Sequence, residues 1–176
     1  MLTRRTFVSD VRGVAAVEFA LLLPILMLLY FGVVELTQGA MTQQRAAHAA
    51  STIGDLTAQS SSLTKAQVGD IFTVGTTTMY PYPTATLKMR ITSLAANSAG
   101  TVKVVWSQGQ GLTAYAPGTT MTPPTNVIAA NESAVMSESS YTYTSIFGEL
   151  MPTPVTFKST YYLHPRLSTQ VTCADC

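Results

Sequence analysis

Few residues in this 176-residue chain have a type and a position that suggest chemistry, and Glu18 is the first of them. It is the single acid in an apolar stretch from Val14 to Val34, which is otherwise interrupted only by Pro24 and Gly32. An ionised group deep in lipid is costly and usually pairs with another charge, so Glu18 indicates an ion pair with a partner. A Glu18 that lies shallow, near the cytoplasmic headgroups, and needs no partner is the alternative.

The two cysteines, Cys173 and Cys176, form the second candidate, as CADC in the last four residues. If this part of the chain is exported, the pair favours a disulfide over a metal site, which would need further ligands. No helix follows that would lower a thiol pKa, so we expect a structural link that closes the tail and not a redox centre.

The sequence contains no other constellation typical of an enzyme. His48 and His164 have no metal-binding spacing, and the GxSxG, P-loop and GxGxxG motifs are absent. The acids are sparse and scattered, which argues against paired-carboxylate catalysis. A net charge of +1 with 11% charged residues gives no basic surface for nucleic acid. We therefore expect no enzyme activity, cofactor, metal, nucleic-acid partner or small-molecule substrate.

The apolar stretch that carries Glu18 is long enough to cross a membrane. As a helix, its 21 residues reach roughly 31 Å. Three arginines and one aspartate precede it, so the positive-inside rule places residues 1–13 in the cytoplasm and the chain after about residue 36 across the membrane. The stretch is longer than the apolar region of a cleaved secretory signal, and no good small-x-small site follows it. We expect a single-pass inner-membrane protein with a transmembrane helix at 14–35.

Two helices are predicted beyond the membrane. Residues 36–57 keep a helical, amphipathic pattern without proline, which continues the membrane helix as a stalk. A second helix is expected from Lys65 to about Val74, capped by Ser62 or Thr64, and YPYP (80–83) ends it.

The rest of the chain, within a domain at 58–176, follows a period of two. TLKMRITSL and TVKVVWS each place apolar residues on one face, and AANSAG between them indicates a hairpin loop. Two further strands are expected in SAVMSESSYTYTSI and VTFKSTYYLH. Four antiparallel strands against one or two helices give an α+β fold. We expect one core to bury Leu87, Ile91, Val104, Trp106 and Phe157. The tyrosines favour packing in the strands over a contact surface.

The beginning of the chain resembles type IV prepilins and pseudopilins: a short basic leader, a glycine, and an apolar helix with glutamate five residues on. VEFALLLP looks like the Glu-Phe/Tyr signature of the Tad (tight adherence) branch. Later segments such as ASTIGDLTAQ, LTKAQVGDIF, VVWSQG and STYYLHPR look like TadE/TadG-type pilus assembly proteins of alphaproteobacteria. Major Tad pilins are very short, whereas about 140 residues follow the membrane segment here, so the resemblance implies a minor, pseudopilin-like subunit.

The resemblance also implies roles for single residues. A prepilin peptidase would cut between Gly13 and Val14, and Glu18, followed by the signature Phe19, would pair with the N-terminal ammonium of a neighbouring subunit. One helical turn separates Val14 from Glu18, so the two charges lie on one side of the helix. Pro24 lacks the N–H that a helix uses, which predicts a kink near residues 20–24, or is tolerated there without one.

The hypothesis is therefore a minor pseudopilin of a Tad-type pilus, needed for pilus assembly or initiation and for surface adhesion. Its expected partners are the prepilin peptidase, other pilin and pseudopilin subunits, and inner-membrane platform proteins of the pilus. Its C-terminal domain would be periplasmic, with incorporation into the pilus left open. An uncleaved bitopic scaffold protein of the same machinery is the alternative, and a membrane-anchored periplasmic enzyme or ligand-binding module is a third class.

Overall fold

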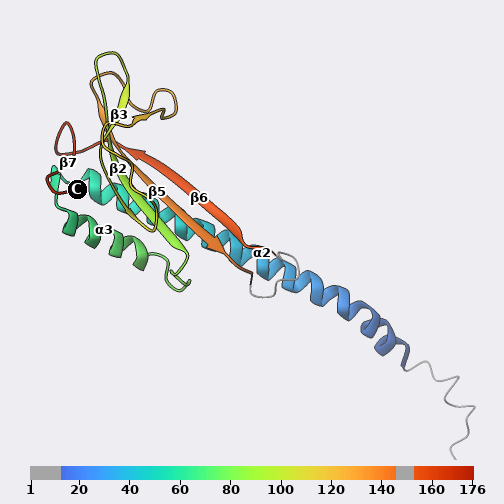
Figure 1. Ribbon diagram of the computed structural model, residues 1–176. Coiled ribbons are helices and arrows are strands. Elements are labelled where there is room, and N and C mark those ends of the chain that lie inside the picture. The colour runs from blue at the N-terminus through green and yellow to red at the C-terminus, as the bar shows by residue number, and fades with distance from the viewer. Residues whose placement is uncertain (1–12, 146–152) are drawn as a thin grey trace, which may run out of the picture.

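The computed structural model describes residues 13–145 and 153–176 of the chain. Most of the predicted leader, residues 1–12, lies outside the described residues. One long helix, α2 (Val14–Ala58), projects from an α+β domain whose sheet packs against its second half (Figure 1). At 1.5 Å per residue its 45 residues extend about 68 Å. The expected membrane helix and stalk are thus one continuous element, and the division at residues 35 and 36 stays a prediction.

The second half of α2 is buried along a stripe of small side chains. Apart from Glu35 and Ile53, every buried residue of the helix is glycine, alanine or threonine: Gly32, Gly39, Thr42, Ala46, Ala49, Ala50, Gly54, Thr57 and Ala58. Most of them recur at three- or four-residue intervals, which places them on one helix face. Small side chains let the sheet approach the helix backbone closely. Ser139 Oγ donates a 2.7 Å hydrogen bond to the Ala46 carbonyl.

The second helix, α3 (Lys65–Thr77), begins where the sequence predicts and ends three residues later than expected. Thr64 is its N-cap. The backbone N–H of Gln67 donates to Thr64 Oγ1 at 3.3 Å, and the backbone N–H of Thr64 donates to Gln67 Oε1 at 2.9 Å. These two bonds form a capping box. Ser62, the other candidate cap, lies instead in the two-residue strand β1 (Ser62–Leu63), which pairs in parallel with β7 (Thr172–Cys173).

The main sheet has five antiparallel strands in the order β4-β3-β2-β5-β6. Four of them are the predicted strands: β2 (Leu87–Ala96), β3 (Val102–Gln110), β5 (Ser133–Tyr143) and β6 (Val155–Leu163). The expected α+β fold with a β2–β3 hairpin is therefore confirmed. The short edge strand β4 (Thr120–Met121) was not expected.

One face of the sheet packs on the two helices and holds the larger core (Figure 1). This core joins Ile53 of α2 and Phe72 of α3 to Met89 and Ile91 of β2 and Trp106 of β3. The segment between β3 and β5 covers part of the opposite face and closes a smaller core. That core contains Leu94, Val102, Val104 and Met136, with Tyr115, Met121 and Ile128 partly buried against it.

The prediction of one core was wrong for Val104, because the β2–β3 ladder contains a β-bulge. Ser93 pairs with Trp106, but the next residue, Leu94, pairs with Val104, so Val105 is an extra residue on β3. Ser93 and Leu94 point to opposite faces of the sheet, and their partners therefore do the same. Trp106 enters the core beneath the helices, whereas Val104 enters the core on the other face.

Two glycines test the close contact between helix and sheet. A Cβ at Gly54 of α2 would lie 2.5 Å from Ser137 Oγ and 2.6 Å from Leu163 Cδ1, whereas a Cβ at Gly69 of α3 would meet no atom within 4 Å. We expect Gly54→Ala to lower the free energy of unfolding by about 1–3 kcal/mol through overpacking. Gly69→Ala, the matched control, should raise it by about 0.5–1 kcal/mol.

Denaturant unfolding of the detergent-solubilised chain, followed by the fluorescence of Trp106, measures both changes. Trp106 is the single tryptophan and is only 3% exposed. Equal effects of the two substitutions would contradict the close helix–sheet contact.

Candidate functional site

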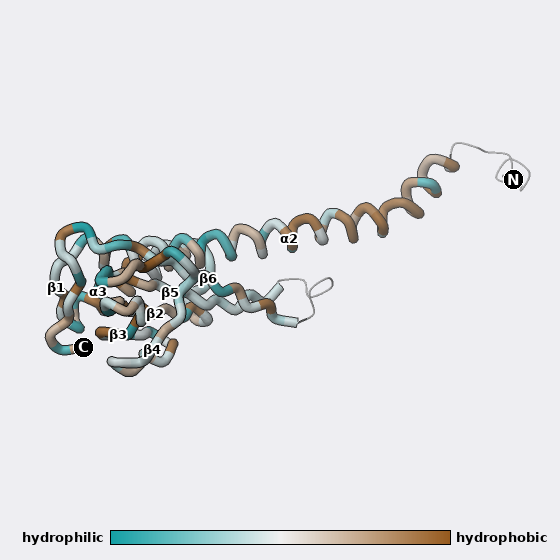
Figure 2. Tube along the Cα trace, turned by 90° about the horizontal axis from the view of Figure 1, so that it is seen from above, coloured by the Kyte–Doolittle hydropathy of each residue, from teal (hydrophilic) through white to brown (hydrophobic). Residues whose placement is uncertain are grey.

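The first half of α2 is an uncovered apolar surface. Its large side chains are exposed: Val14, Val17, Phe19, Leu21, Leu22, Leu23, Ile25, Leu26, Met27, Leu28, Leu29, Tyr30 and Val33. Figure 2 shows this apolar half of the helix projecting from the more polar domain. Only 6% of the most apolar 18-residue window is buried, so it does not serve as a core helix of its own chain. Among the described residues, α2 is the one helix long and apolar enough to cross a membrane.

The predicted processing and pairing residues lie together at the start of this helix. Gly13 is the N-cap residue and makes no side-chain cap, and Val14 is the first helical residue. Glu18 is the fifth residue of α2, one turn from Val14, and is exposed among apolar neighbours, as is Phe19. The helix continues without interruption through Pro24, and the bend at residues 20–24 stays a prediction.

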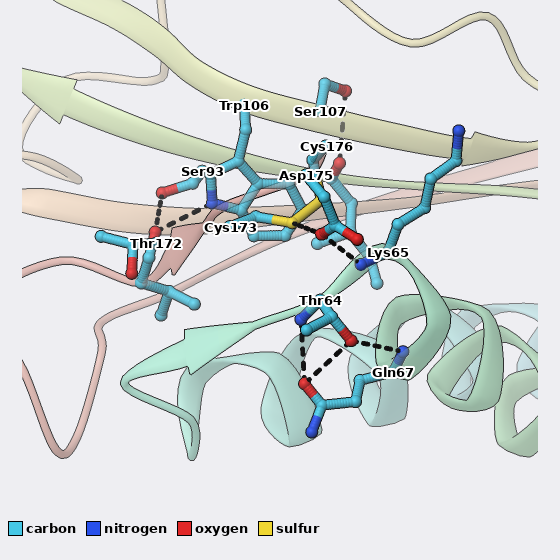
Figure 3. Close-up of a disulfide and its surroundings, with 12 residues drawn as sticks. Thr64, Lys65, Gln67, Ser93, Trp106, Ser107, Thr172, Cys173, Asp175 and Cys176 are labelled. Carbon is cyan, nitrogen blue, oxygen red and sulfur yellow. Dashed lines mark hydrogen bonds between the residues drawn. A yellow bond between two sulfur atoms is a disulfide. The ribbon is translucent and has the colours of Figure 1, made fainter.

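In the structure, Cys173 and Cys176 are joined in a disulfide, with their Cα atoms 5.6 Å apart. Asp175, inside this small loop, accepts a 2.8 Å hydrogen bond through Oδ1 from the Lys65 amide (Figure 3). That amide is one of the free N–H groups at the start of α3, so the loop supplies a second cap beside Thr64. The link therefore fixes the tail of the chain to the N-terminus of α3.

The tail is also fastened to the main sheet at Val171. This residue is fully buried, and its carbonyl oxygen accepts hydrogen bonds from Ser93 Oγ at 3.0 Å and from Trp106 Nε1 at 2.9 Å. Neither Val171 nor Asp175 belongs to a motif that the sequence reveals. Both form hydrogen bonds with partners more than 60 residues away in the sequence, and no local sequence pattern predicts such contacts.

A polar cluster around Arg90 is structural. Arg90 forms a salt bridge with Glu138, with Nε and Oε2 2.7 Å apart, lies over the ring of Tyr115, and donates to the Thr113 carbonyl. These contacts hold the chain after β3 against the sheet. Cys173, Asp175 and Cys176 are the one group of potential metal ligands found in those residues, and the disulfide engages both sulfurs.

Comparison with known proteins finds a family-model match in the first part of the chain. Residues 13–54 match the family model of TadE-like protein. The match begins at Gly13 and covers α2 almost to its end, so the resemblance found in the sequence is confirmed over this segment. No curated protein and no solved structure matches the chain.

The disulfide is expected to contribute little stability, because it closes a loop of only four residues. Replacing both cysteines, Cys173→Ser with Cys176→Ser, should lower the free energy of unfolding by at most about 2 kcal/mol. Denaturant unfolding followed by Trp106 fluorescence measures the change. A reductant should bring the unmodified protein to the midpoint of the variant and leave the variant itself unchanged. A variant that is unfolded at room temperature would show that the link is essential to the domain.

Proposed function

We propose that this chain, a TadE-like protein over residues 13–54, is a minor pseudopilin of a Tad-type pilus that takes part in pilus assembly or initiation and in surface adhesion. The observation that carries the proposal is the division of α2. One half is covered by the chain's own domain, and the other half is apolar, uncovered and carries Glu18. A subunit of this form can pack its free half-helix among other helices while its domain stays outside the bundle.

Processing by a prepilin peptidase is the first step of the proposed function. The Gly13–Val14 bond joins the N-cap to the first residue of α2, and Gly13 carries no side chain that would obstruct an enzyme. The family match begins at this same glycine. Cleavage would leave Val14 with a free ammonium at the very start of an uncovered apolar helix.

Charge pairing between subunits is the second step. Glu18 is exposed on the part of α2 that lipid or other helices surround, and an unpaired carboxylate is costly there. The ammonium of a neighbouring subunit would neutralise it, and the pair would set the register of one helix along the next. Since removing one partner of a buried ion pair leaves the other charge uncompensated, assembly becomes sensitive to this single side chain.

The domain from residue 58 onward would lie in the periplasm and recognise other pilus subunits and the inner-membrane platform proteins. The basic leader supports this orientation through the positive-inside rule. The disulfide supports it as well, because such links persist in oxidising compartments. An uncleaved bitopic scaffold of the same machinery would use the same anchor, and it differs in keeping residues 1–13.

Processing is tested by N-terminal sequencing of the protein from membranes of strains with and without the prepilin peptidase. We expect Val14 as the first residue when the peptidase is present and Met1 when it is absent. Gly13→Ala should slow cleavage and Gly13→Leu should block it, because the peptidase would have to accommodate a side chain. Gly69→Ala serves as the control and should be processed normally. An intact Met1 in the strain with the peptidase would favour the scaffold alternative.

Pairing is tested by substituting Glu18. Glu18→Ala should leave membrane insertion and cleavage intact but lower pilus number and surface adhesion, because the neighbour's ammonium loses its partner. Glu18→Asp should retain part of the function. Asp70→Ala, which removes an exposed carboxylate of α3, is the matched control. Pilus counts by electron microscopy give the readout, and normal piliation with Glu18→Leu would refute the pairing role.

A further inference from the structure

A second carboxylate, Glu35, lies on α2 three residues before Gln38, which lines a pocket that the proposed pilus function does not use. The pocket has a volume of about 250 Å³, room for several water-sized groups. Gln38 of α2, Tyr82 of the loop before β2, and Tyr141 and Tyr143 of β5 contribute to its lining. Glu35 precedes Gln38 by three residues and therefore lies on the same side of the helix.

Two polar atoms at this place are buried without a partner. Glu35 is 2% exposed and Tyr143 is 7% exposed, and neither Glu35 Oε1 nor the Tyr143 hydroxyl has a hydrogen-bond partner within the described chain. Burial raises the pKa of the Tyr143 hydroxyl above its ordinary value, and the nearby Glu35 carboxylate adds to the increase, followed by Tyr82 and Tyr141. Glu35 is thus close enough to the tyrosine group to act on it electrostatically. Buried polar atoms without a partner are rare in native proteins, so this pair needs an explanation, and a bound polar group is one.

The other tyrosine hydroxyls of the pocket are already engaged. Tyr82 donates to Gln38 Oε1 at 3.1 Å, and Tyr141 donates to the Pro83 carbonyl at 2.9 Å. Their rings can still offer π-faces, which attract cations. The described lining of the pocket therefore offers aromatic rings and one unpaired hydroxyl and contains no lysine or arginine, and the Glu35 carboxylate lies near Tyr143. This chemistry suits a small ammonium group and disfavours a ligand whose only charge is negative.

The position of the pocket along α2 indicates where such a group comes from. Gln38 follows Val34, the end of the apolar stretch, by four residues, which is about 6 Å of helix. The headgroup layer on each side of a bilayer has about this thickness. Tyrosines are enriched at this level of membrane proteins, where an apolar ring and a polar hydroxyl both find suitable surroundings.

We propose that this pocket binds the ammonium of an ethanolamine phospholipid headgroup from the outer leaflet of the membrane that α2 crosses. Glu35 supplies the opposing charge, the rings of Tyr82, Tyr141 and Tyr143 surround the cation, and the Tyr143 hydroxyl contacts the headgroup. The bound lipid fixes the depth of the helix in the bilayer. The inference rests on the proposed membrane position of α2 and not on processing or Glu18 pairing, so failure of either of those predictions leaves it standing.

The test measures lipid binding to the full-length protein in detergent by native mass spectrometry. The probes are dioctanoyl phosphatidylethanolamine and dioctanoyl phosphatidylglycerol. They share their acyl chains and phosphate, but the first ends in an ammonium and the second in an uncharged glycerol. We expect at least about a tenfold preference for the ethanolamine lipid, corresponding to one charge-assisted hydrogen bond. Glu35→Gln should abolish this preference, and Asp70→Asn, the matched control on exposed α3, should preserve it. Equal binding of the two lipids, or an unchanged preference in a folded Glu35→Gln protein, would overturn the proposal.

A second variant keeps the test decisive if Glu35→Gln does not fold. Tyr143→Phe removes only the unpaired hydroxyl and should weaken binding of the ethanolamine lipid about threefold. Unchanged binding in this variant would overturn the proposal. Nα-acetyl-lysine amide, added at the same concentration as the lipid, stands in for a lysine of another subunit. It should not compete, and displacement of the lipid by it would reassign the pocket to a protein partner.

Discussion

The contact between the sheet and the small residues of α2 is the constraint on which the rest of the molecule depends. Gly54 has no space for even one methyl group, and the Ala46 carbonyl is near enough to the sheet to accept a hydrogen bond from Ser139. Close approach of this kind removes apolar surface from water along the second half of the helix and orders β5 and β6 against it. Because the small residues begin near Gly32, the coverage also begins there, and everything before it is left for other molecules to cover.

Because α2 is continuous, this local contact also determines how the domain is held relative to the apolar half of the helix. No loop separates the covered half of α2 from the uncovered half. The continuous helix therefore connects the sheet rigidly to the apolar start of α2. In a membrane, the depth of that helix would therefore determine how far the domain stands from the bilayer. Contacts of the C-terminal tail hold the opposite end of the domain together. The disulfide loop caps α3 through Asp175, and the Val171 carbonyl binds Ser93 and Trp106. The domain is closed at its far end without using the membrane-proximal surface.

The elements with a strong local pattern were predictable from the sequence, whereas those that depend on distant partners were not. The apolar run, the Thr64 cap and the two-residue alternation of β2 each carry their own signal, and the structure has them where expected. The bulge at Val105 escaped prediction because a ladder irregularity depends on how two strands pair. The strands β1, β4 and β7 have two residues each, too few for any periodicity. Glu35 is the last residue of the expected transmembrane segment, and no local pattern in the sequence indicated its burial.

The two carboxylates of α2 differ because one half of the helix is covered and the other is not. No described residue pairs with Glu18, and the proposed partner is an ammonium of another molecule that packs along the helix. Glu35 is buried under its own domain, and Gln38, three residues further on, lines the pocket in which the proposed headgroup would bind. The proposed roles of the two carboxylates differ with their burial. Exposed Glu18 would pair with a neighbouring helix, and buried Glu35 would attract a lipid headgroup at the membrane surface. On this view the point where the sheet stops covering α2 decides both how the subunit meets its neighbours and how it sits in the bilayer.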